Sequence, residues 1–478
     1  MRAPGQIDSS WTTPAARAAV AATVRLPGSK SMTNRALILA ALADSPTTIV
    51  GPLEARDTDL MTSAIIALGA AVDTSSAVDT SATVDTSSTG DTSSTGDTSS
   101  AGTGATRADP AWTVTPGWDG GKLRVDVGNA GTVLRFVPAA ASLAKADVEF
   151  HGDPRASQRP VGQLLAGLRQ AGVDIDDGGR GAVPFVVHGR GRVAGGAVAL
   201  DASSSSQLIS GLMLAAPRFE TGLEITHHGE RVPSAPHIAM TAAMLTAAGA
   251  VVETYARHGG PETVPDFWRV RPGRVAPGTI AIEPDLSNAA PFLASALVTG
   301  GRVTIAGWPA ISLQAAGQIM DVLGRMGATW QPTEAGMRIE GTGKIRGITS
   351  DLRDISELAP VLTALAALAD SPSEFTGIGH MRLHESDRLA ALAFEIGALG
   401  GQVTELPDGL RIQPRPLRAA VEAFDSHDDH RLVMAAAVLG LAVPGLRIRN
   451  ATTVGKTFPA FQALWLQMLG EQAPGQAP

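Results

Sequence analysis

The sequence predicts an α/β protein built from six similar units, and three observations support this fold class. Short polar openings recur along the chain, and each is followed by a helical segment rich in Ala and Leu. After most openings comes a second amphipathic segment that ends at a glycine, where a helix C-cap is expected. β-branched runs such as residues 47–50 follow the helical segments and are typical of strands.

The repeat can be followed from one end of the chain to the other. The openings begin at Gly28, Gly128, Asp201, Asp285, Asp354 and Asp425. The second helices are predicted at 60–69, 161–172, 238–249, 313–327, 389–400 and 461–470. Any α/β protein alternates helix and strand, but alternation alone does not explain the recurring polar opening. We therefore favour a true internal repeat.

Residues 73–103 interrupt this pattern. Asp recurs at positions 73, 79, 85, 91 and 97, and most of the residues between them are Thr and Ser. A segment with almost no apolar side chains cannot bury a core, so the sequence predicts a disordered surface insertion. A functional acidic tether is the alternative to a tolerated loop expansion.

Composition limits the classes of function. A chain of 478 residues is long enough for two large domains. Its net charge of −8 argues against a nucleic-acid partner, and the lack of cysteine excludes disulfides and thiolate chemistry. The histidines show no metal-ligand spacing, so no metal site is expected. No secretory signal or membrane span is predicted, so we expect a soluble cytoplasmic protein.

The polar openings are suited to binding anions, because each lies at a helix N-terminus with free backbone N–H groups. In LPGSKSMTNRAL, Lys30 and Ser31 begin the helix and Arg35 lies one turn later on the same face. The GxxxxGK[ST] spacing of a nucleotide-binding loop is absent. Taken alone, this opening fits an anion site and an ordinary serine-capped helix equally well.

Other openings carry similar groups. Arg155 and Arg159 precede a helix with Pro160 in its first turn, where a cation opposes the helix dipole unless an anion is bound. The serines before Gln207 suit either a flexible cap or a polyol ligand, and Ser234 with His237 fits a structural cap. The last third of the chain adds further charged groups at predicted helix starts: His384, Glu385, Asp387, Arg388, Asp429, His430, Arg431 and Lys456. Their arginines and lysine could together hold a compact polyanion.

Seven ordered motifs carry a resemblance to a known family. LPGSKSMTNRAL, GNAGT, an Arg-x-x-x-Arg-Pro segment, SSQ, HESDRL, DDHR and GKTFP resemble the signature segments of EPSP synthases, most of all actinobacterial members. The resemblance covers nearly the whole chain except the insertion and the tails.

The resemblance implies a two-lobed fold with three βαβαββ units per lobe, each lobe an inside-out α/β barrel. Lobe one would combine residues 1–27 with 283–478, and lobe two would span 28–282 and contain the insertion.

The implied reaction transfers the enolpyruvyl group of phosphoenolpyruvate to the 5-hydroxyl of shikimate 3-phosphate and releases phosphate by addition–elimination. This step belongs to the shikimate pathway, which leads to chorismate and the aromatic amino acids. The resemblance also implies inhibition by glyphosate, no metal and no other cofactor, and we expect a monomer.

The resemblance also implies site residues. The residues for shikimate 3-phosphate would be Lys30, Ser31, Arg35, Ser205, Ser206, Gln207, Ser234, Glu357 and His384. The residues for phosphoenolpyruvate would be Lys30, Asn129, Gly131, Thr132, Arg159, Gln207, Arg388, Arg431 and Lys456. Glu357 would accept a proton, and Glu385 and Lys30 would be the other catalytic groups.

The chain departs from the family pattern in places. His384 stands where relatives often have Lys, Phe136 where many have Pro, and His237 where some have Tyr. Two other functions remain open at this point. A UDP-N-acetylglucosamine enolpyruvyl transferase would share the donor, although its usual catalytic cysteine is absent. A non-catalytic phosphosugar-binding protein would need the anion sites but not an acid/base pair.

Overall fold

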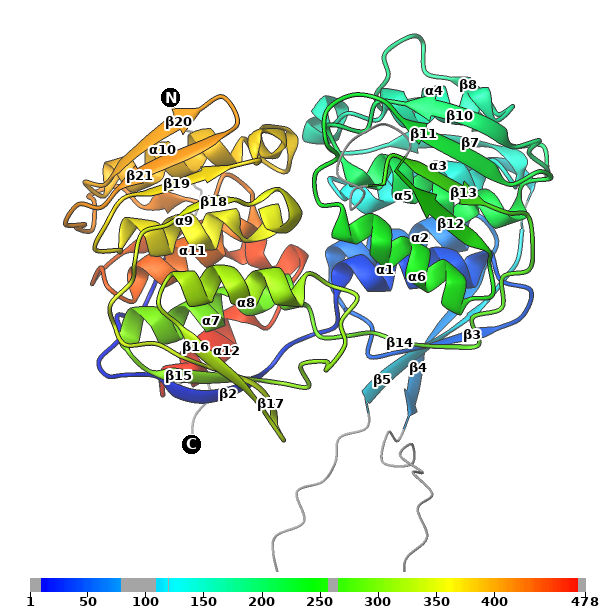
Figure 1. Ribbon diagram of the computed structural model, residues 1–478. Helices are drawn as coiled ribbons and strands as arrows, with labels where there is room; N and C mark the ends of the chain where they lie inside the picture. The colour runs from blue at the N-terminus through cyan, green and yellow to red at the C-terminus, as the bar shows by residue number, and fades with distance from the viewer. Residues whose placement is uncertain (1–9, 79–108, 119, 257–264, 472–478) are drawn as a thin grey trace, which may run out of the picture.

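The computed structural model describes residues 10–78, 109–118, 120–256 and 265–471. It has two lobes, each with three small sheets on the outside and helices in the middle (Figure 1). Five of the sheets have four strands and share one topology, in which a parallel pair is extended by two antiparallel strands. The repeat predicted from the sequence and the two-lobed α/β fold are therefore confirmed.

In the lobe that we propose to span residues 28–282, the first sheet contains β3 Thr47–Val50, β4 Ala71–Val78, β5 Asp109–Thr115 and β14 Thr279–Ala281. The second contains β6 Gly120–Asp126, β7 Lys145–His151, β8 Asp174–Asp176 and β9 Phe185–His188. The third contains β10 Gly196–Leu200, β11 Leu223–His227, β12 Val252–Tyr255 and β13 Phe267–Val270. The helices between them are α1 Lys30–Ala41, α2 Arg56–Ala67, α3 Gly131–Ala141, α4 Gly162–Gln170, α5 Ser206–Ala215 and α6 Pro236–Ala247.

The other lobe repeats this plan. One sheet contains β2 Ala21–Arg25, β15 Arg302–Ala306, β16 Thr329–Thr333 and β17 Gly336–Glu340, and the next contains β18 Thr349–Asp351, β19 Ser373–Thr376, β20 Gln402–Leu406 and β21 Gly409–Gln413. The third has β1 Trp11–Thr12, β22 Phe424–Asp425 and β23 Arg447–Arg449. Its helices are α7 Leu286–Thr299, α8 Ala316–Arg325, α9 Ala359–Ala367, α10 Arg388–Ala398, α11 His430–Gly440 and α12 Phe461–Met468.

The first helix of each unit lies in the centre of its lobe. Every residue of α3 and α11 is buried, so these helices pack against other elements on all sides rather than along one stripe. The second helix of each unit ends before a glycine with positive φ, as the sequence predicted; Gly69 (φ 110°) and Gly327 (φ 113°) are examples. The repeat thus gives every unit one central helix, with the polar opening at or just before the start of that helix.

The chain crosses between the lobes near Gly28 and Pro284, which form an isolated antiparallel bridge. A Cβ at Gly28 would lie 2.1 Å from the carbonyl oxygen of Gly51, so only glycine fits this crossing. Buried apolar side chains form two separate clusters, one on each side of the crossings. These clusters support our proposal of lobes at 28–282 and at 1–27 with 283–478.

The predicted insertion at 73–103 is wrong at its first residues. Residues 73–78 belong to β4, which pairs with β5 through a register shift between Asp73 and Ser76. Pairing with a neighbouring strand outweighs the low strand propensity of this polar segment. The rest of the predicted insertion lies outside the described residues.

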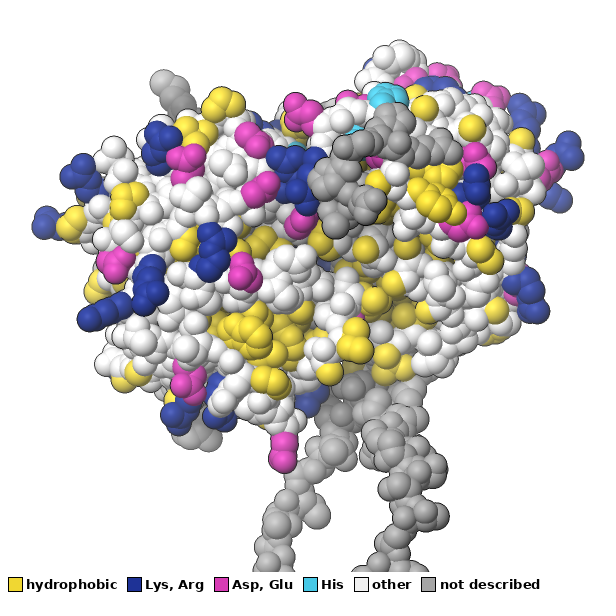
Figure 2. Space-filling view, viewed as in Figure 1, with side chains coloured by type: hydrophobic (Ala, Val, Ile, Leu, Met, Phe, Trp, Pro, Cys, Tyr) yellow, Lys and Arg dark blue, Asp and Glu magenta, His cyan; other side chains and the backbone are white. Residues whose placement is uncertain are grey.

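Charged side chains of both signs are interspersed on the face shown in Figure 2. Within the described residues, no helix is long and apolar enough to cross a membrane.

Candidate active site

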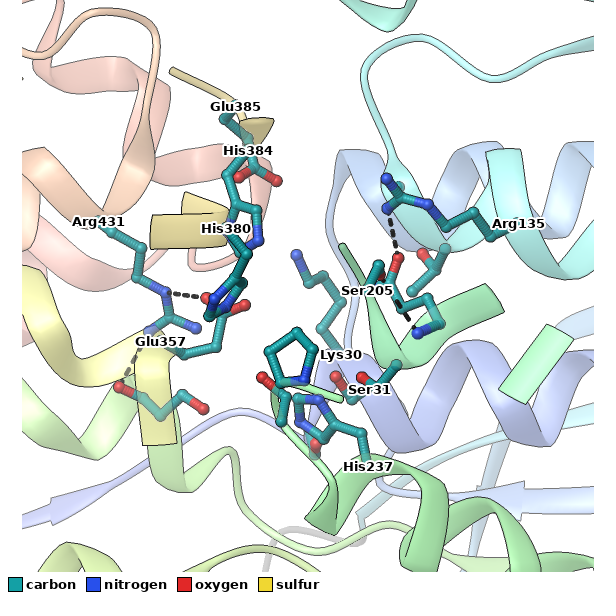
Figure 3. A pocket seen from close by; sticks show the side chains of 18 of the residues that line it. Lys30, Ser31, Arg135, Ser205, His237, Glu357, His380, His384, Glu385 and Arg431 are labelled. Carbon is teal, nitrogen blue, oxygen red and sulfur yellow. Dashed lines mark hydrogen bonds and ion pairs between the residues drawn. The ribbon is translucent and has the colours of Figure 1, made fainter. Parts of the chain in front are cut away.

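A polar pocket lies between the two lobes, and side chains from both line it (Figure 3). Most of the predicted site residues come together here: Lys30, Ser31, Gly131, Thr132, Arg159, Ser205, Ser206, Gln207, Ser234, Glu357, His384, Glu385 and Arg431. They lie at or just before the starts of the central helices, or in the short turns beside them. The helix starts therefore face one another across the pocket, as an anion-binding cleft requires.

Lys30 begins α1, where the Ser29 side chain caps the helix by accepting from the Met32 N–H. The Lys30 ammonium is 3.1 Å from the Asp57 carboxylate. Burial lowers the pKa of Lys30, but the carboxylates of Asp57, Glu385 and Glu357 more than reverse this and leave the pKa raised. Lys30 is therefore a protonated cation in the pocket and not a base.

Arg135 and Arg159 supply two further cations on the same wall, and both are buried. Arg135 donates to the Gln207 side-chain oxygen (2.8 Å) and to the Pro160 carbonyl (3.2 Å). Arg159 donates to the Asn129 carbonyl at 2.6 Å. Burial lowers the pKa of Arg135 to about 9, which leaves it protonated at neutral pH. These contacts hold both guanidiniums in place beside the GNAGT loop.

Arg135 was not predicted from the sequence, although a signal was present. It follows Gly131 by four residues, and Arg35 follows Ser31 by the same spacing in the first unit. Side chains four apart share a helix face, so the repeat could have identified it. Asp57 and His380 were also missed, because neither is next to a polar opening in the sequence.

On the opposite wall, Arg388 is at the centre of an ion-pair network. Its Nε donates to the buried Asp429 carboxylate at 2.7 Å. Its Nη1 lies 3.2 Å from Glu357, and its Nη2 lies 2.9 Å from Glu385. Arg431 approaches Glu357 to 3.6 Å, and Arg159 reaches Glu385 from the other lobe at 3.5 Å. Glu357 and Glu385 are thus paired with Arg431 and Arg159, which line the pocket, and with Arg388 beneath them.

The arginines keep both carboxylates ionised. Burial raises the pKa of Glu357, but Arg388 and Arg431 outweigh it and hold the pKa well below its usual value. Burial likewise raises the pKa of Glu385, and Arg159 and Arg388 hold that pKa well below its usual value. Without bound anions, each carboxylate is therefore a weak base.

Three histidines line the pocket near Glu357. Burial lowers the pKa of His237 and of His380 to about 4, and it holds the pKa of His384 well below its usual value. The His384 Nδ1 lies 3.1 Å from Arg388 Nη1, which can only donate, so the Nε2 of this neutral ring carries the proton. His384 thus presents a neutral donor where a cation is usual in the family.

Four predicted residues do not line this pocket. Arg35 is buried behind it and donates to Thr241, Ser210 and the carbonyls of Ser31 and His237. Arg388 lies beneath the two carboxylates. Asn129 and Lys456 line a neighbouring, more open cavity that shares Glu385 with the pocket. Among the described residues, no group of three or more His, Asp or Glu side chains is placed to hold a metal ion.

The fold is one that solved enolpyruvyl transferases share. A structure of EPSP synthase from Acinetobacter baumannii aligns with 22% identity over 96% of this chain and 98% of that chain (TM-score 0.71). The enolpyruvyl transferase NikO from Streptomyces tendae aligns with 18% identity over 97% of this chain and 98% of that one (TM-score 0.67). At these identities, the likeness establishes the fold.

The family model "EPSP synthase (3-phosphoshikimate 1-carboxyvinyltransferase)" matches residues 14–107 and 111–465. The chain belongs to this family. It is an enzyme of the shikimate pathway that transfers the enolpyruvyl group of phosphoenolpyruvate to shikimate 3-phosphate, and the nucleotide-sugar alternative is not favoured.

Proposed function

We propose that the pocket between the lobes is where this transfer takes place, and that the two substrates bind at neighbouring parts of it. Lys30, Ser31, Ser205, Ser206 and Ser234 bind shikimate 3-phosphate, helped by Gln207 and His384. The observation that carries the proposal is the convergence of these hydroxyls, Lys30 and two buried arginines on one pocket. Arg35 supports this wall from behind by donating to the Ser31 carbonyl.

Phosphoenolpyruvate binds on the side of the GNAGT loop. Gly131 and Thr132 line the pocket there, and Arg159 and Arg431 offer guanidiniums suited to a phosphate or a carboxylate. Arg388 lies beneath Glu357 and Glu385 and acts through its ion pairs with these two carboxylates. Asn129 and Lys456 line the adjoining cavity, so they meet the donor at the outer end of the site.

The arginine–carboxylate pairs explain how Glu357 becomes a base. In the absence of substrate, Glu357 and Glu385 pair with cations that also suit the donor's anionic groups. When phosphoenolpyruvate takes over Arg159 and Arg431, Glu385 and Glu357 each lose a partner and gain a neighbouring negative charge. Both changes raise their pKa values toward the range useful for proton transfer.

The addition step then moves two protons, one away from the attacking hydroxyl and one onto the donor. The 5-hydroxyl oxygen of shikimate 3-phosphate bonds to C2 of phosphoenolpyruvate and loses its proton to Glu357. C3 of the donor gains a proton, which Glu385 or Lys30 supplies. In the elimination step, the tetrahedral adduct expels phosphate while its methyl group returns a proton and the double bond re-forms. The facing cations and helix starts stabilise the charge that develops on the adduct.

Both walls of the pocket come from one chain, so the proposal includes a monomer as the working unit. It also includes a cytoplasmic location and no nucleic-acid partner. The net charge of −8 and the interspersed charges in Figure 2 support the proposal that the protein has no nucleic-acid partner.

The test is incubation with shikimate 3-phosphate and phosphoenolpyruvate, following phosphate release and the enolpyruvyl product together. We expect equal amounts of both. A protein that binds both substrates without turnover would be a binding protein, and turnover on UDP-N-acetylglucosamine alone would overturn the assignment.

A further inference from the structure

Arg155 makes contacts across the cleft that the proposed function does not use. It lies in the 3-10 helix η2 (Pro154–Gln158) of the 28–282 lobe. Its Nε and Nη2 donate to the carbonyl of His384 at 3.2 and 3.1 Å, and Nη2 also donates to the carbonyl of Arg382 at 3.2 Å. These carbonyls belong to the other lobe.

Arg155 is fixed to its own lobe before it reaches across. Its Nη1 donates to the Gln158 side chain at 2.5 Å. The preceding Asp153 donates its N–H to the Gly128 carbonyl at 2.9 Å and forms an ion pair with Arg56 at 3.1 Å. The segment that carries Arg155 is therefore anchored to the start of the GNAGT loop through Asp153.

The segment that Arg155 holds carries a catalytic carboxylate. Arg382 and His384 lie three residues and one residue before Glu385, whose carboxylate contacts Arg159 at 3.5 Å. Arg155 and Arg159 are four residues apart in the chain. Arg155 therefore contacts the backbone, and Arg159 the Glu385 side chain, of the same short segment.

We propose that Arg155 is a positioning residue for the transfer reaction: by bridging two backbone carbonyls across the cleft, it places the Glu385 carboxylate beside the donor site. The inference rests on the proposed role of Glu385 in proton transfer. Arg155 itself lines the outer cavity and not the pocket that holds the predicted ligands. Among the described residues, it forms no ion pair, so its contacts here are hydrogen bonds to neutral oxygens.

The geometry makes the guanidinium fork essential, because one group must reach two carbonyls. Arg155→Lys keeps the charge but replaces the planar fork with a single ammonium. We expect Arg155→Ala and Arg155→Lys both to lower kcat by roughly ten- to hundredfold, as small misplacements of catalytic groups do. The Kd for shikimate 3-phosphate should change by less than about threefold, because most of its ligands lie on the wall that Arg155 does not move.

The matched control is Arg124→Ala. Arg124 is an exposed arginine of the same lobe, paired with Glu149 on the neighbouring strand, and it lines neither the pocket nor the outer cavity. This variant should keep the parental kcat. Full activity of Arg155→Lys together with a raised KM for phosphoenolpyruvate in Arg155→Ala would overturn the proposal, because it would show a charge that binds the donor directly.

A double-mutant cycle with Glu385→Ala tests whether Arg155 acts through that carboxylate. If it does, Arg155→Ala should cost less than about threefold in the Glu385→Ala background. Equal losses in both backgrounds would overturn the proposal.

Amide hydrogen exchange across residues 379–388, with shikimate 3-phosphate bound, gives a readout that needs no turnover. Exchange should rise in both Arg155 variants and stay unchanged in Arg124→Ala; no rise in the Arg155 variants would overturn the proposal. If the parent itself has no turnover, the proposed function fails, and this exchange measurement still decides the role of Arg155.

Discussion

The two walls of the cleft hold their arginines with different partners. On the wall of the 28–282 lobe, Arg35 and Arg135 donate to hydroxyls, an amide oxygen and backbone carbonyls. On the facing wall, Arg388 and Arg431 pair with Glu357, and Arg388 also binds Asp429 and Glu385. Neutral partners leave the positive charge available, whereas carboxylates neutralise it.

This difference implies a division of work. On the first wall, Arg135 can take up a phosphate without rearranging, because neutral partners hold its guanidinium in place, whereas Lys30 is paired with Asp57. The second wall must exchange carboxylates for substrate anions, and that exchange changes the basicity of the same carboxylates. One wall is thus suited to binding and the other to proton transfer.

The largest expected effect tests the second wall. Glu357→Gln keeps the size and hydrogen bonding of the side chain but removes the base, so we expect kcat to fall by at least roughly a hundredfold. Binding of shikimate 3-phosphate, measured by calorimetry, should weaken only modestly. The control is Glu374→Gln, which alters an exposed glutamate paired with Arg411.

If the turnover of Glu357→Gln stayed within a fewfold of the parent, Glu357 would not be the base. It would only stabilise a helix start, by about 0.3–1 kcal/mol. The base would then have to be Glu385, because the raised pKa of Lys30 keeps that residue protonated.

A smaller effect tests the first wall at its donor end. A Cβ at Gly131 would lie 2.6 Å from the Arg159 guanidinium and 3.0 Å from that of Arg135, so both must shift. We expect Gly131→Ala to raise the KM for phosphoenolpyruvate by about tenfold, equivalent to about 1.4 kcal/mol. The variant should also resist glyphosate. Equal inhibition of parent and variant would show that the GNAGT loop does not adjoin the donor.

The comparison also predicts a difference between two pH profiles. Without the donor, Arg388 and Arg431 hold the pKa of Glu357 well below its usual value, so kcat/KM for phosphoenolpyruvate should fall only at pH values below the usual glutamate range. In the full complex the pKa rises, so the acid limb of kcat should lie higher, by about one pH unit per 1.4 kcal/mol of lost pairing. Rapid-quench measurement of the chemical step checks this. Coincident limbs would mean that the arginines stay with the carboxylates.

Much of the fold and most of the site could be predicted from the sequence, because the information is local. The glycines that end the second helices and the polar openings are adjacent to the elements they define, as at Gly69 and Lys30. His380 reaches the pocket from a short 3-10 helix that has no periodic signal, and Asp57 reaches Lys30 from another helix. Strand β4 runs into the polar repeat because β5 lies beside it. These features depend on tertiary packing, which no local pattern encodes.

The smallest expected effect concerns the sheet of β3, β4, β5 and β14, which lies at the lower edge of its lobe in Figure 1. Val78 and Asp109 are paired directly across the β4–β5 ladder, so a turn of about two to five residues can join them. We predict that replacing residues 79–108 with an Asn-Gly turn changes kcat and both KM values by less than about twofold, a barrier change of about 0.4 kcal/mol. The first wall is assembled from α1, α3 and α5, and its Arg35 and Arg135 are held by Thr241 and Gln207 of the same lobe. A selective loss of shikimate 3-phosphate affinity would show that this wall depends on the polar repeat. The contrast between a wall suited to binding and a wall suited to proton transfer would then fail.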